Sequence, residues 1–280
     1  MFTELCDRIT LDTTETKSPE DVMRFLRAAL LTSFAVTASA GSGAAQAVSL
    51  PYDHVHLAAP DQAKAVEWYQ KMFGGQTTPE GKDRLLYGKT RFIWLKSETA
   101  QPSANTAIDH IGFSFADLDA KMKEFQAAGV KVVTPVRDVP GLFKLGFIED
   151  PWGVKIEVVQ DPEALGFHHV HLRAMDPAVS LAWYKERFGG ESAKLKGRID
   201  ALKYGDVWVL VQKADAAPTA SAGHALDHVG WRVTNLDKTL EDLKGIKVLQ
   251  GVTNLQLATG LVRFSMVEDP AGTKIELVQR

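Results

Sequence analysis

The residues best suited to chemistry in this sequence are histidines and glutamates that recur at matching positions. Six of the eight histidines form three matched pairs: His54 with His169, His56 with His171, and His110 with His228. Each series ends in a glutamate, Glu157 or Glu276, inside an otherwise apolar segment. A carboxylate there is costly unless it is paired or bound to a cation. Two imidazoles and one carboxylate form a facial metal triad with open coordination positions, so the sequence predicts divalent-metal sites at these residues.

A second histidine follows each opening histidine by two residues. His56 and His171 therefore share a strand face with His54 and His169, respectively. We interpret both as proton carriers or substrate contacts. The alternative is a supporting hydrogen bond to the ligands, or packing within the sheet.

Three further side chains are candidates for substrate binding. Arg173 and Arg232 lie four residues beyond His169 and His228, where the first half has alanine and serine. They predict an anion clamp in the second half, with solvation of a strand edge as the alternative. Trp94 is expected to make the site in the first half more apolar.

These positions belong to a tandem duplication that fills most of the chain. Four segments of the first half return in the second: residues 52–57 as 167–172, 68–75 as 183–190, 109–112 as 227–230 and 149–157 as 268–276. A repeat of this length indicates two domains rather than a solenoid. We expect domains at residues 48–160 and 166–280, joined by a linker at 161–165.

Each half is predicted to have an α+β fold. Asp61 is placed to cap a helix that carries Val66, Tyr69 and Phe73 on one face. A second helix is expected after Asp117. The remaining apolar runs predict strands, so that each half contains two units of a strand, a helix and three strands.

The first 47 residues resemble a leader rather than part of the fold. From Met23, a basic start is followed by an apolar run and by Ala45-Gln46-Ala47, which is typical of a secretory signal peptide cleaved after Ala47. An uncleaved anchor and a surface helix are the alternatives. Translation from Met23 would explain the acidic residues 1–22. We therefore expect a periplasmic or secreted protein without a stable membrane anchor after cleavage.

Composition excludes several classes of protein. The chain has 280 residues, of which 45% are hydrophobic and 24% charged, as in soluble globular proteins. A net charge of −3 offers no basic footprint for nucleic acid. The one cysteine, Cys6, excludes a disulfide framework and a cysteine-based zinc site.

The repeated motifs together resemble the vicinal oxygen chelate superfamily, which includes glyoxalases, bleomycin-resistance proteins and extradiol dioxygenases. The motifs are His-Val-x-Leu, Trp-Tyr with Phe-Gly-Gly, Asp-His-Ile/Val-Gly, and Glu-Asp-Pro-x-Gly-x-Lys-Ile-Glu. The resemblance implies paired βαβββ modules that form a cup-shaped mixed sheet around a divalent metal. It places the ligands at His54, His110 and Glu157 in one half and at His169, His228 and Glu276 in the other.

Two departures from the family's motifs limit the activities that the resemblance implies. The strands at 91–95 and 207–211 lack the fourth, acidic or amide ligand of glyoxalase I. Phe147 and Met266 stand where the extradiol dioxygenases have a tyrosine. Neither activity is therefore assigned from the motifs.

The resulting hypothesis is an exported metalloprotein, either a lyase or a dioxygenase, that acts on a small oxygen-rich substrate. Its metal is expected to be Fe2+, Mn2+ or Zn2+, since mixed nitrogen and oxygen ligands do not select among them. The alternatives are a small-molecule binding protein, or one catalytic and one structural domain. A monomer and a homodimer both fit the sequence, as does exchange of modules between neighbouring halves.

Overall fold

A computed structural model describes residues 49–257 and 259–280 of the chain. The expected leader and its cleavage site after Ala47 lie outside these residues. Within the described ranges, no helix combines the length and the apolar character needed to cross a membrane.

The first half contains two successive units of one strand, one helix and three strands, as the sequence predicts. The first unit consists of β1 (Tyr52–Ala59), α2 (Gln62–Phe73), β2 (Gln76–Thr78), β3 (Gly81–Tyr87) and β4 (Thr90–Lys96). The second consists of β5 (Ile108–Ser114), α3 (Leu118–Ala127), β6 (Lys131–Asp138), β7 (Lys144–Glu149) and β8 (Lys155–Val159). Asp61 and Asp117 cap the two helices by accepting backbone hydrogen bonds, which confirms the predicted starts.

The second half repeats this order. Its first unit consists of β9 (Gly166–Ala174), α4 (Pro177–Phe188), β10 (Glu191–Leu195), β11 (Ile199–Tyr204) and β12 (Val207–Lys213). Its second consists of β13 (Leu226–Arg232), α5 (Leu236–Asp242), β14 (Lys247–Leu257), β15 (Gly260–Glu268) and β16 (Lys274–Gln279).

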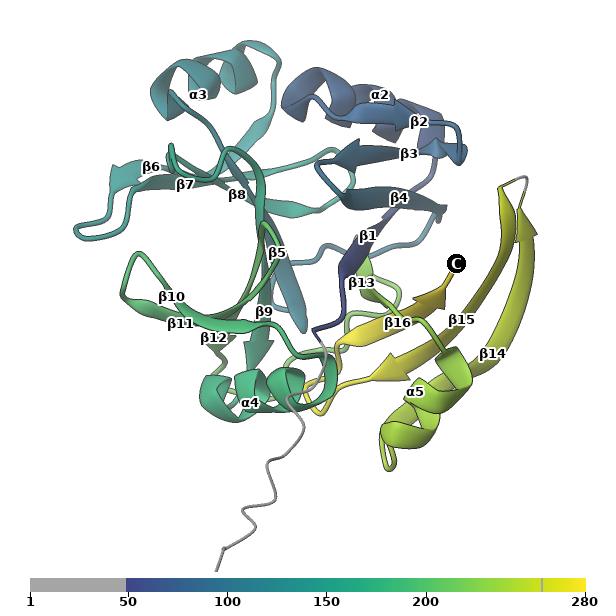
Figure 1. Cartoon of the computed structure of the whole chain (residues 1–280). Helices are drawn as coiled ribbons and strands as arrows, with labels where there is room; N and C mark the ends of the chain where they lie inside the picture. Colours follow the sequence, from purple (N-terminus) through teal and green to yellow (C-terminus); the bar gives the residue numbers. More distant parts are fainter. Residues whose placement is uncertain (1–48, 258) are drawn as a thin grey trace, which may run out of the picture. The chain divides into compact units, whose positions relative to one another are not determined.

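The strands form two eight-stranded mixed sheets, each drawing one unit from each half (Figure 1). Sheet I has the order β14-β15-β16-β13-β1-β4-β3-β2, and sheet II has the order β10-β11-β12-β9-β5-β8-β7-β6. The halves join through antiparallel pairing of β1 with β13 and of β5 with β9. The fold class is as predicted, and the paired modules in each sheet come from different halves.

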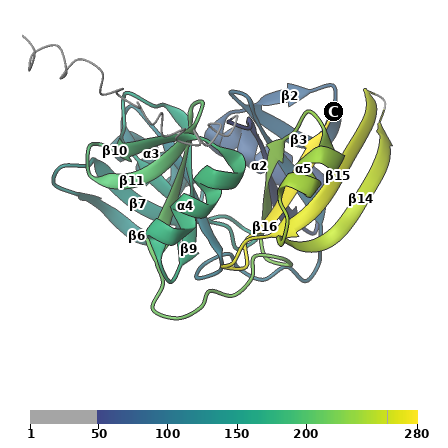
Figure 2. The ribbon, with the colours of Figure 1, turned by 60° about the horizontal axis from the view of Figure 1, so that its bottom comes forward.

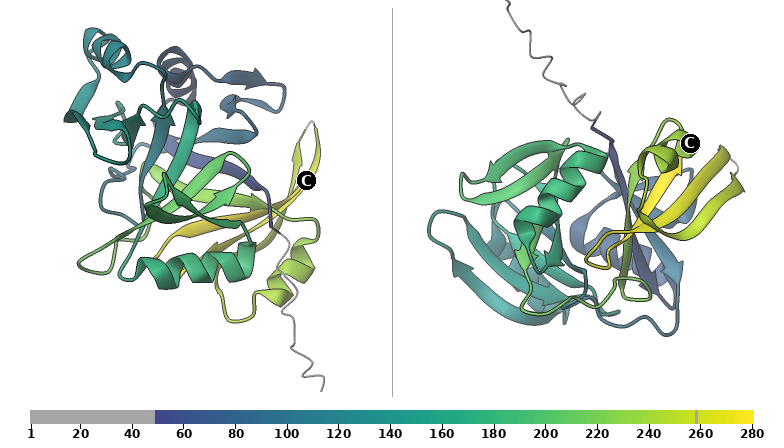
Figure 3. Two further views of the ribbon diagram at one scale, coloured as in Figure 1. Left: turned by 60° about the vertical axis from the view of Figure 1, so that its left-hand side comes forward. Right: turned by 90° about the horizontal axis from the view of Figure 1, so that it is seen from below.

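One hydrophobic core holds the two units of a half together. Helices α2 and α3 lie side by side (Figures 1 and 3), and Phe73 packs against Phe125 with ring centroids 5.5 Å apart. The hydroxyl of Tyr69 donates to Asp150 at 2.9 Å, and Tyr184 donates to Asp269 at 2.8 Å. The repeated Trp-Tyr and Asp-Pro motifs therefore tie each first unit to the following unit.

The hairpin of β14 and β15 projects at one end of sheet I (Figure 2). Strand β14 is the terminal strand of that sheet. Several large apolar side chains on the hairpin are exposed, including Val248, Leu255 and Leu261.

The exchange of units predicts how an isolated half should behave. Residues 49–165 alone would expose the edges of β1 and β5, which pair with β13 and β9 in the whole chain. Because β5 is the repeat equivalent of β13, and β1 of β9, two copies of the half can complete both sheets. We expect this fragment to sediment as a dimer in analytical ultracentrifugation. A stable, native-like monomer would contradict the pairing.

Candidate metal centres

The cluster on sheet I joins residues of both halves. His54 and His56 lie on β1, His228 on β13 and Glu276 on β16. Their candidate ligand atoms all lie within 4.8 Å of one another. His228 Nε2 lies 3.1 Å from Glu276 Oε2, and His54 Nε2 lies 3.4 Å from the same oxygen. We call these four residues site I.

Site II is the equivalent cluster on sheet II. It contains His110 of β5, Glu157 of β8, and His169 and His171 of β9, again with ligand atoms within 4.8 Å of one another. Glu157 Oε2 lies 3.0 Å from His110 Nε2 and 3.1 Å from His169 Nε2.

The six predicted ligands thus assemble, but their expected grouping by half was wrong. His54 lies with His228 and Glu276 rather than with His110 and Glu157. The reason is strand pairing: β1 has β13, not β5, as its hydrogen-bonded neighbour. His169 joins the ligands of the first half in the same way.

The chemistry of these donors fits a divalent ion. The Nε2 atoms of His54 and His169 are buried and approach the glutamate oxygen of their cluster at 3.4 and 3.1 Å, but neither forms a hydrogen bond of acceptable geometry with a described residue. A buried imidazole nitrogen without a partner is costly, and ligation would satisfy it. Ligands about 2.1 Å from a shared ion lie within about 4.2 Å of one another, so each cluster needs only a small contraction.

The electrostatics of both sites favour a positive charge beside the glutamate. Burial alone would lower the pKa of His54, but Glu276 and Asp53 raise it to about 9. Burial opposes ionisation of Glu276 and Glu157, yet histidine neighbours hold the pKa of both carboxyls well below the ordinary value. A bound cation would take the place of the imidazolium proton.

The residues that orient the ligands were not singled out from the sequence. Asp109 and Asp227 lie 2.6 and 2.5 Å from Nδ1 of the histidine that follows each of them, and Asp53 lies 2.8 Å from Nδ1 of His54. Such carboxylates fix the ring and leave Nε2 for the metal. The sequence contains the signal, because an aspartate directly precedes three of the four candidate histidine ligands. His168 precedes the fourth, and its Nδ1 lies 2.8 Å from Nδ1 of His169.

His56 and His171 are the least buried members of their clusters. Both are partly exposed, whereas the other six residues are buried. The ring of His56 stacks on His228 with centroids 4.2 Å apart, and His171 Nδ1 lies 3.0 Å from His110 Nε2. Burial and neighbouring histidines lower the pKa of both imidazoles well below the ordinary value, so they are neutral.

The structure does not support the predicted substrate contacts as a group. Arg173 lies on sheet II and Arg232 on sheet I, so they cannot form one clamp. Arg173 donates to Asn105 at 2.9 Å, and Arg232 donates to Asp53 at 2.7 Å. Trp94 pairs with Leu57, faces away from the cluster and packs on Tyr69 with ring centroids 5.0 Å apart. Its buried ring belongs to the core because the opposite face of β4 carries Arg91 and Ile93.

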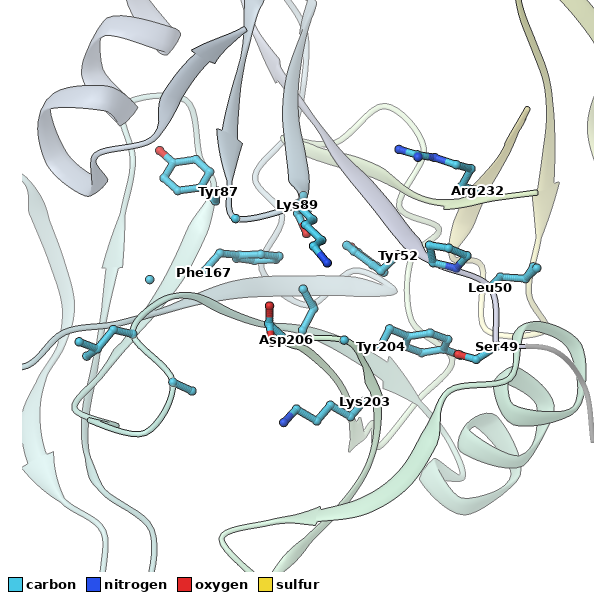
Figure 4. Close-up of a pocket in the computed structure, with 18 of the residues that line it drawn as sticks. Ser49, Leu50, Tyr52, Tyr87, Lys89, Phe167, Lys203, Tyr204, Asp206 and Arg232 are labelled. Carbon is cyan, nitrogen blue, oxygen red and sulfur yellow. The ribbon is translucent and has the colours of Figure 1, made fainter. Parts of the chain in front are cut away.

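A cavity of about 740 Å³ lies elsewhere, where the two halves meet. Figure 4 shows Lys89 beside Tyr87 on one side and Asp206 beside Tyr204 on the other. None of the eight cluster residues lines this cavity, although Arg232 lies at its edge. The cavity is therefore separate from both candidate metal centres.

Comparisons with known proteins identify the family and the fold. The family model described as Glyoxalase/Bleomycin resistance protein/Dioxygenase superfamily matches residues 52–158 and 166–277. A search of curated proteins found no match. The solved structure of glyoxalase I from Zea mays is similar with a TM-score of 0.65 and 20% identity, covering 82% of this chain and 92% of that one.

A Bacillus subtilis protein, provisionally described as a dioxygenase, is similar with a TM-score of 0.54 and 13% identity, covering 82% of this chain and 85% of that chain. At such low identities, similarity to solved structures shows only a shared fold. The family model, in contrast, matches the sequence of both halves. The chain therefore belongs to the glyoxalase/bleomycin resistance protein/dioxygenase superfamily.

Proposed function

We propose that the protein is a metal-dependent enzyme with a divalent ion at each site, acting on a small substrate with neighbouring oxygen atoms. The observation that carries the proposal is the pair of four-residue clusters, each with a buried histidine Nε2 that lies close to the glutamate but forms no hydrogen bond with a described residue. His54, His228 and Glu276 would hold one ion, and His169, His110 and Glu157 the other. Fe2+, Mn2+ and Zn2+ all suit these ligands.

The reaction we favour is a proton transfer of the lyase type. A bound ion would act as a Lewis acid that polarises substrate oxygens. His56 and His171 are less buried than the other members of their clusters, so each imidazole would be within reach of a substrate and could accept a proton from it. Asp53, Asp109 and Asp227 each hold Nδ1 of the histidine that follows, so Nε2 of these three rings would be left to bind the ion.

Substitution of the proton carriers tests this assignment. We expect His56→Ala and His171→Ala each to retain metal while lowering kcat at the affected site by about 10²- to 10⁴-fold, the usual contribution of a general base. Metal analysis alongside steady-state kinetics checks both parts. Loss of the ion from either variant would make that histidine a fourth ligand instead.

The whole proposal is tested by elemental analysis of the purified protein, followed by substrate screening with the metal it contains. We expect about two ions per chain. Hemithioacetals and 2-oxoacids test the lyase reaction, and catechols with an oxygen electrode test the dioxygenase reaction. Turnover of a catechol with oxygen uptake would show a dioxygenase instead of a lyase. Inactivity across all three classes, with tight binding by metal-free protein, would favour a binding protein.

We also propose that the protein is exported. The support is the basic, apolar and small-residue pattern of residues 23–47. N-terminal sequencing of the exported protein should begin at Val48. Detection of residues 1–22 in that fraction, or confinement to the cytoplasm, would overturn this proposal.

A further inference from the structure

The faces of the two sheets that carry the clusters differ at equivalent positions. Strand pairing, together with the alternation of side chains along each strand, places four arginines on this face of sheet I: Arg84, Arg91, Arg232 and Arg280. Their repeat equivalents on sheet II are Ala201, Trp208, Ser114 and Asp161. At these four positions, sheet I carries cations and sheet II carries none.

Three of these arginines converge on one buried carboxylate. Asp53 is fully buried and accepts hydrogen bonds from Arg232 at 2.7 Å, from Arg280 at 2.5 Å and from Arg91 at 3.4 Å. Arg84 and Arg91 also pair with Asp83 and Glu80. Four guanidinium groups thus face three carboxylates, which leaves one positive charge in excess.

The guanidinium groups keep donors for a ligand. Each has five N–H donors, and hydrogen bonds to described residues use two on Arg232 and one on Arg280. The Arg232 side chain is 41% exposed. Burial, together with Arg91 and Arg232, lowers the pKa of Arg280, so an added anion would relieve repulsion among these cations.

On sheet II, apolar side chains take the places of Arg84 and Arg91, whereas Ser114 and Asp161 bond to each other and Asp161 pairs with Lys196 at 2.8 Å. Leu195, Ala201 and Leu210 are buried there and pack with Phe143, Ile199 and Trp208. Arg198 also donates to the carbonyl of Pro140, which ties the β10–β11 turn to the β6–β7 loop. Among residues 49–257 and 259–280, no hydrogen bond or salt bridge joins the equivalent β14–β15 hairpin to β2 or β3. This part of sheet II is filled, whereas sheet I keeps its cationic groups.

We propose that Arg91, Arg232 and Arg280 bind an oxyanion, a carboxylate or phosphate, at one end of the substrate of site I, and that site II lacks this subsite. The ring of His54 lies between the arginines and the metal cluster, because its Nδ1 faces Asp53 and its Nε2 faces Glu276. The substrate is thus an elongated anion with metal-binding oxygens at the other end. The metal-binding end of the substrate depends on the proposed function, whereas the oxyanion subsite is inferred from the arginines.

The test is titration calorimetry of the full chain with inorganic phosphate and with succinate at low ionic strength. We expect one ion per chain, and about tenfold or greater loss of affinity in Arg232→Gln and Arg280→Gln, as for a lost charge-assisted hydrogen bond. Arg173→Gln is the matched control, because Arg173 follows His169 as Arg232 follows His228; its affinity should not change. The stronger of the two probes identifies the kind of oxyanion.

A further variant separates this inference from the metal proposal. Glu276→Ala should lose metal at site I and still bind phosphate, since the arginines remain. Loss of phosphate binding in this folded variant would place the anion on the metal and overturn the subsite. So would absence of saturable binding in the unaltered protein, or an equal loss of affinity in Arg173→Gln. If the protein bound phosphate but took up no divalent metal, the subsite would stand and the metal proposal alone would be refuted.

Discussion

Replacing Glu276 with alanine should remove the metal from site I and leave site II filled. Glu276 is the one anionic member of its four-residue cluster, so its loss would leave a divalent ion on neutral imidazoles. Changes to residues that merely support metal ligands cost about ten- to a hundredfold in affinity, and loss of the carboxylate itself should cost more. Metal stoichiometry should fall from about two ions per chain to one.

The matched variant is Glu157→Ala, which should empty site II alone. Both variants should remain folded, because removing the ion together with the carboxylate leaves a small apolar side chain in an apolar strand. Melting temperatures measured with and without added metal would report the lost stabilisation by ligand binding. Full occupancy after Glu276→Ala, with an unchanged melting temperature, would show that site I binds no metal.

Each sheet combines one unit from each half, so substituting the histidines tests which residues share a site. His54→Ala should empty the same site as Glu276→Ala, although the two residues lie in opposite halves of the sequence. His110→Ala should instead act with Glu157→Ala. If His54→Ala and Glu157→Ala were to lose the same ion, the pairing of β1 with β13 would be wrong.

The sequence was sufficient to predict which histidines and glutamates cluster, but not how they are grouped. Repetition identified equivalent residues such as His54 and His169, since matched polar residues in apolar strands demand a common explanation. Equivalence does not determine which copies pair, because β1 can meet either β5 or β13 with the same local pattern. The grouping depends on contacts between segments far apart in the chain.

Strand register explains the other differences. Trp94 was expected beside the site, but its pairing with Leu57 places it on the opposite face of sheet I from His54 and His56. A shift of one residue would reverse that face, and the sequence of β4 alone does not fix the register. The three-residue β2 is too short to show an alternating pattern, and its neighbour β3 positions it.

The glycine of the repeated Asp-His-Ile/Val-Gly motif has a physical cause that the structure reveals. Gly230 pairs with His54 across β13 and β1, and Gly112 pairs with His169 across β5 and β9. A Cβ atom built on either glycine would overlap the imidazole ring of its partner. The first ligand of each site therefore needs a neighbouring strand position without a side chain.

Gly230→Ala should consequently displace His54 and empty site I. The ring is fully buried and Asp53 holds its Nδ1, so it has little room to move. Overpacking of this kind typically costs about 1–3 kcal/mol in the free energy of unfolding. Urea unfolding and metal stoichiometry measure the two effects, and Gly112→Ala should produce the same pair of losses at site II.

Gly251→Ala provides the matched control for this substitution. Gly251 also lies in a strand, β14, but a Cβ atom there would meet no atom within 4 Å. This variant should keep both ions and change the free energy of unfolding by less than about 0.5 kcal/mol, as surface substitutions usually do. If Gly230→Ala behaved like Gly251→Ala, the ring of His54 could not lie against β13. A selective loss of one ion would instead show that a glycine without any chemistry of its own determines where the first ligand of the site can stand.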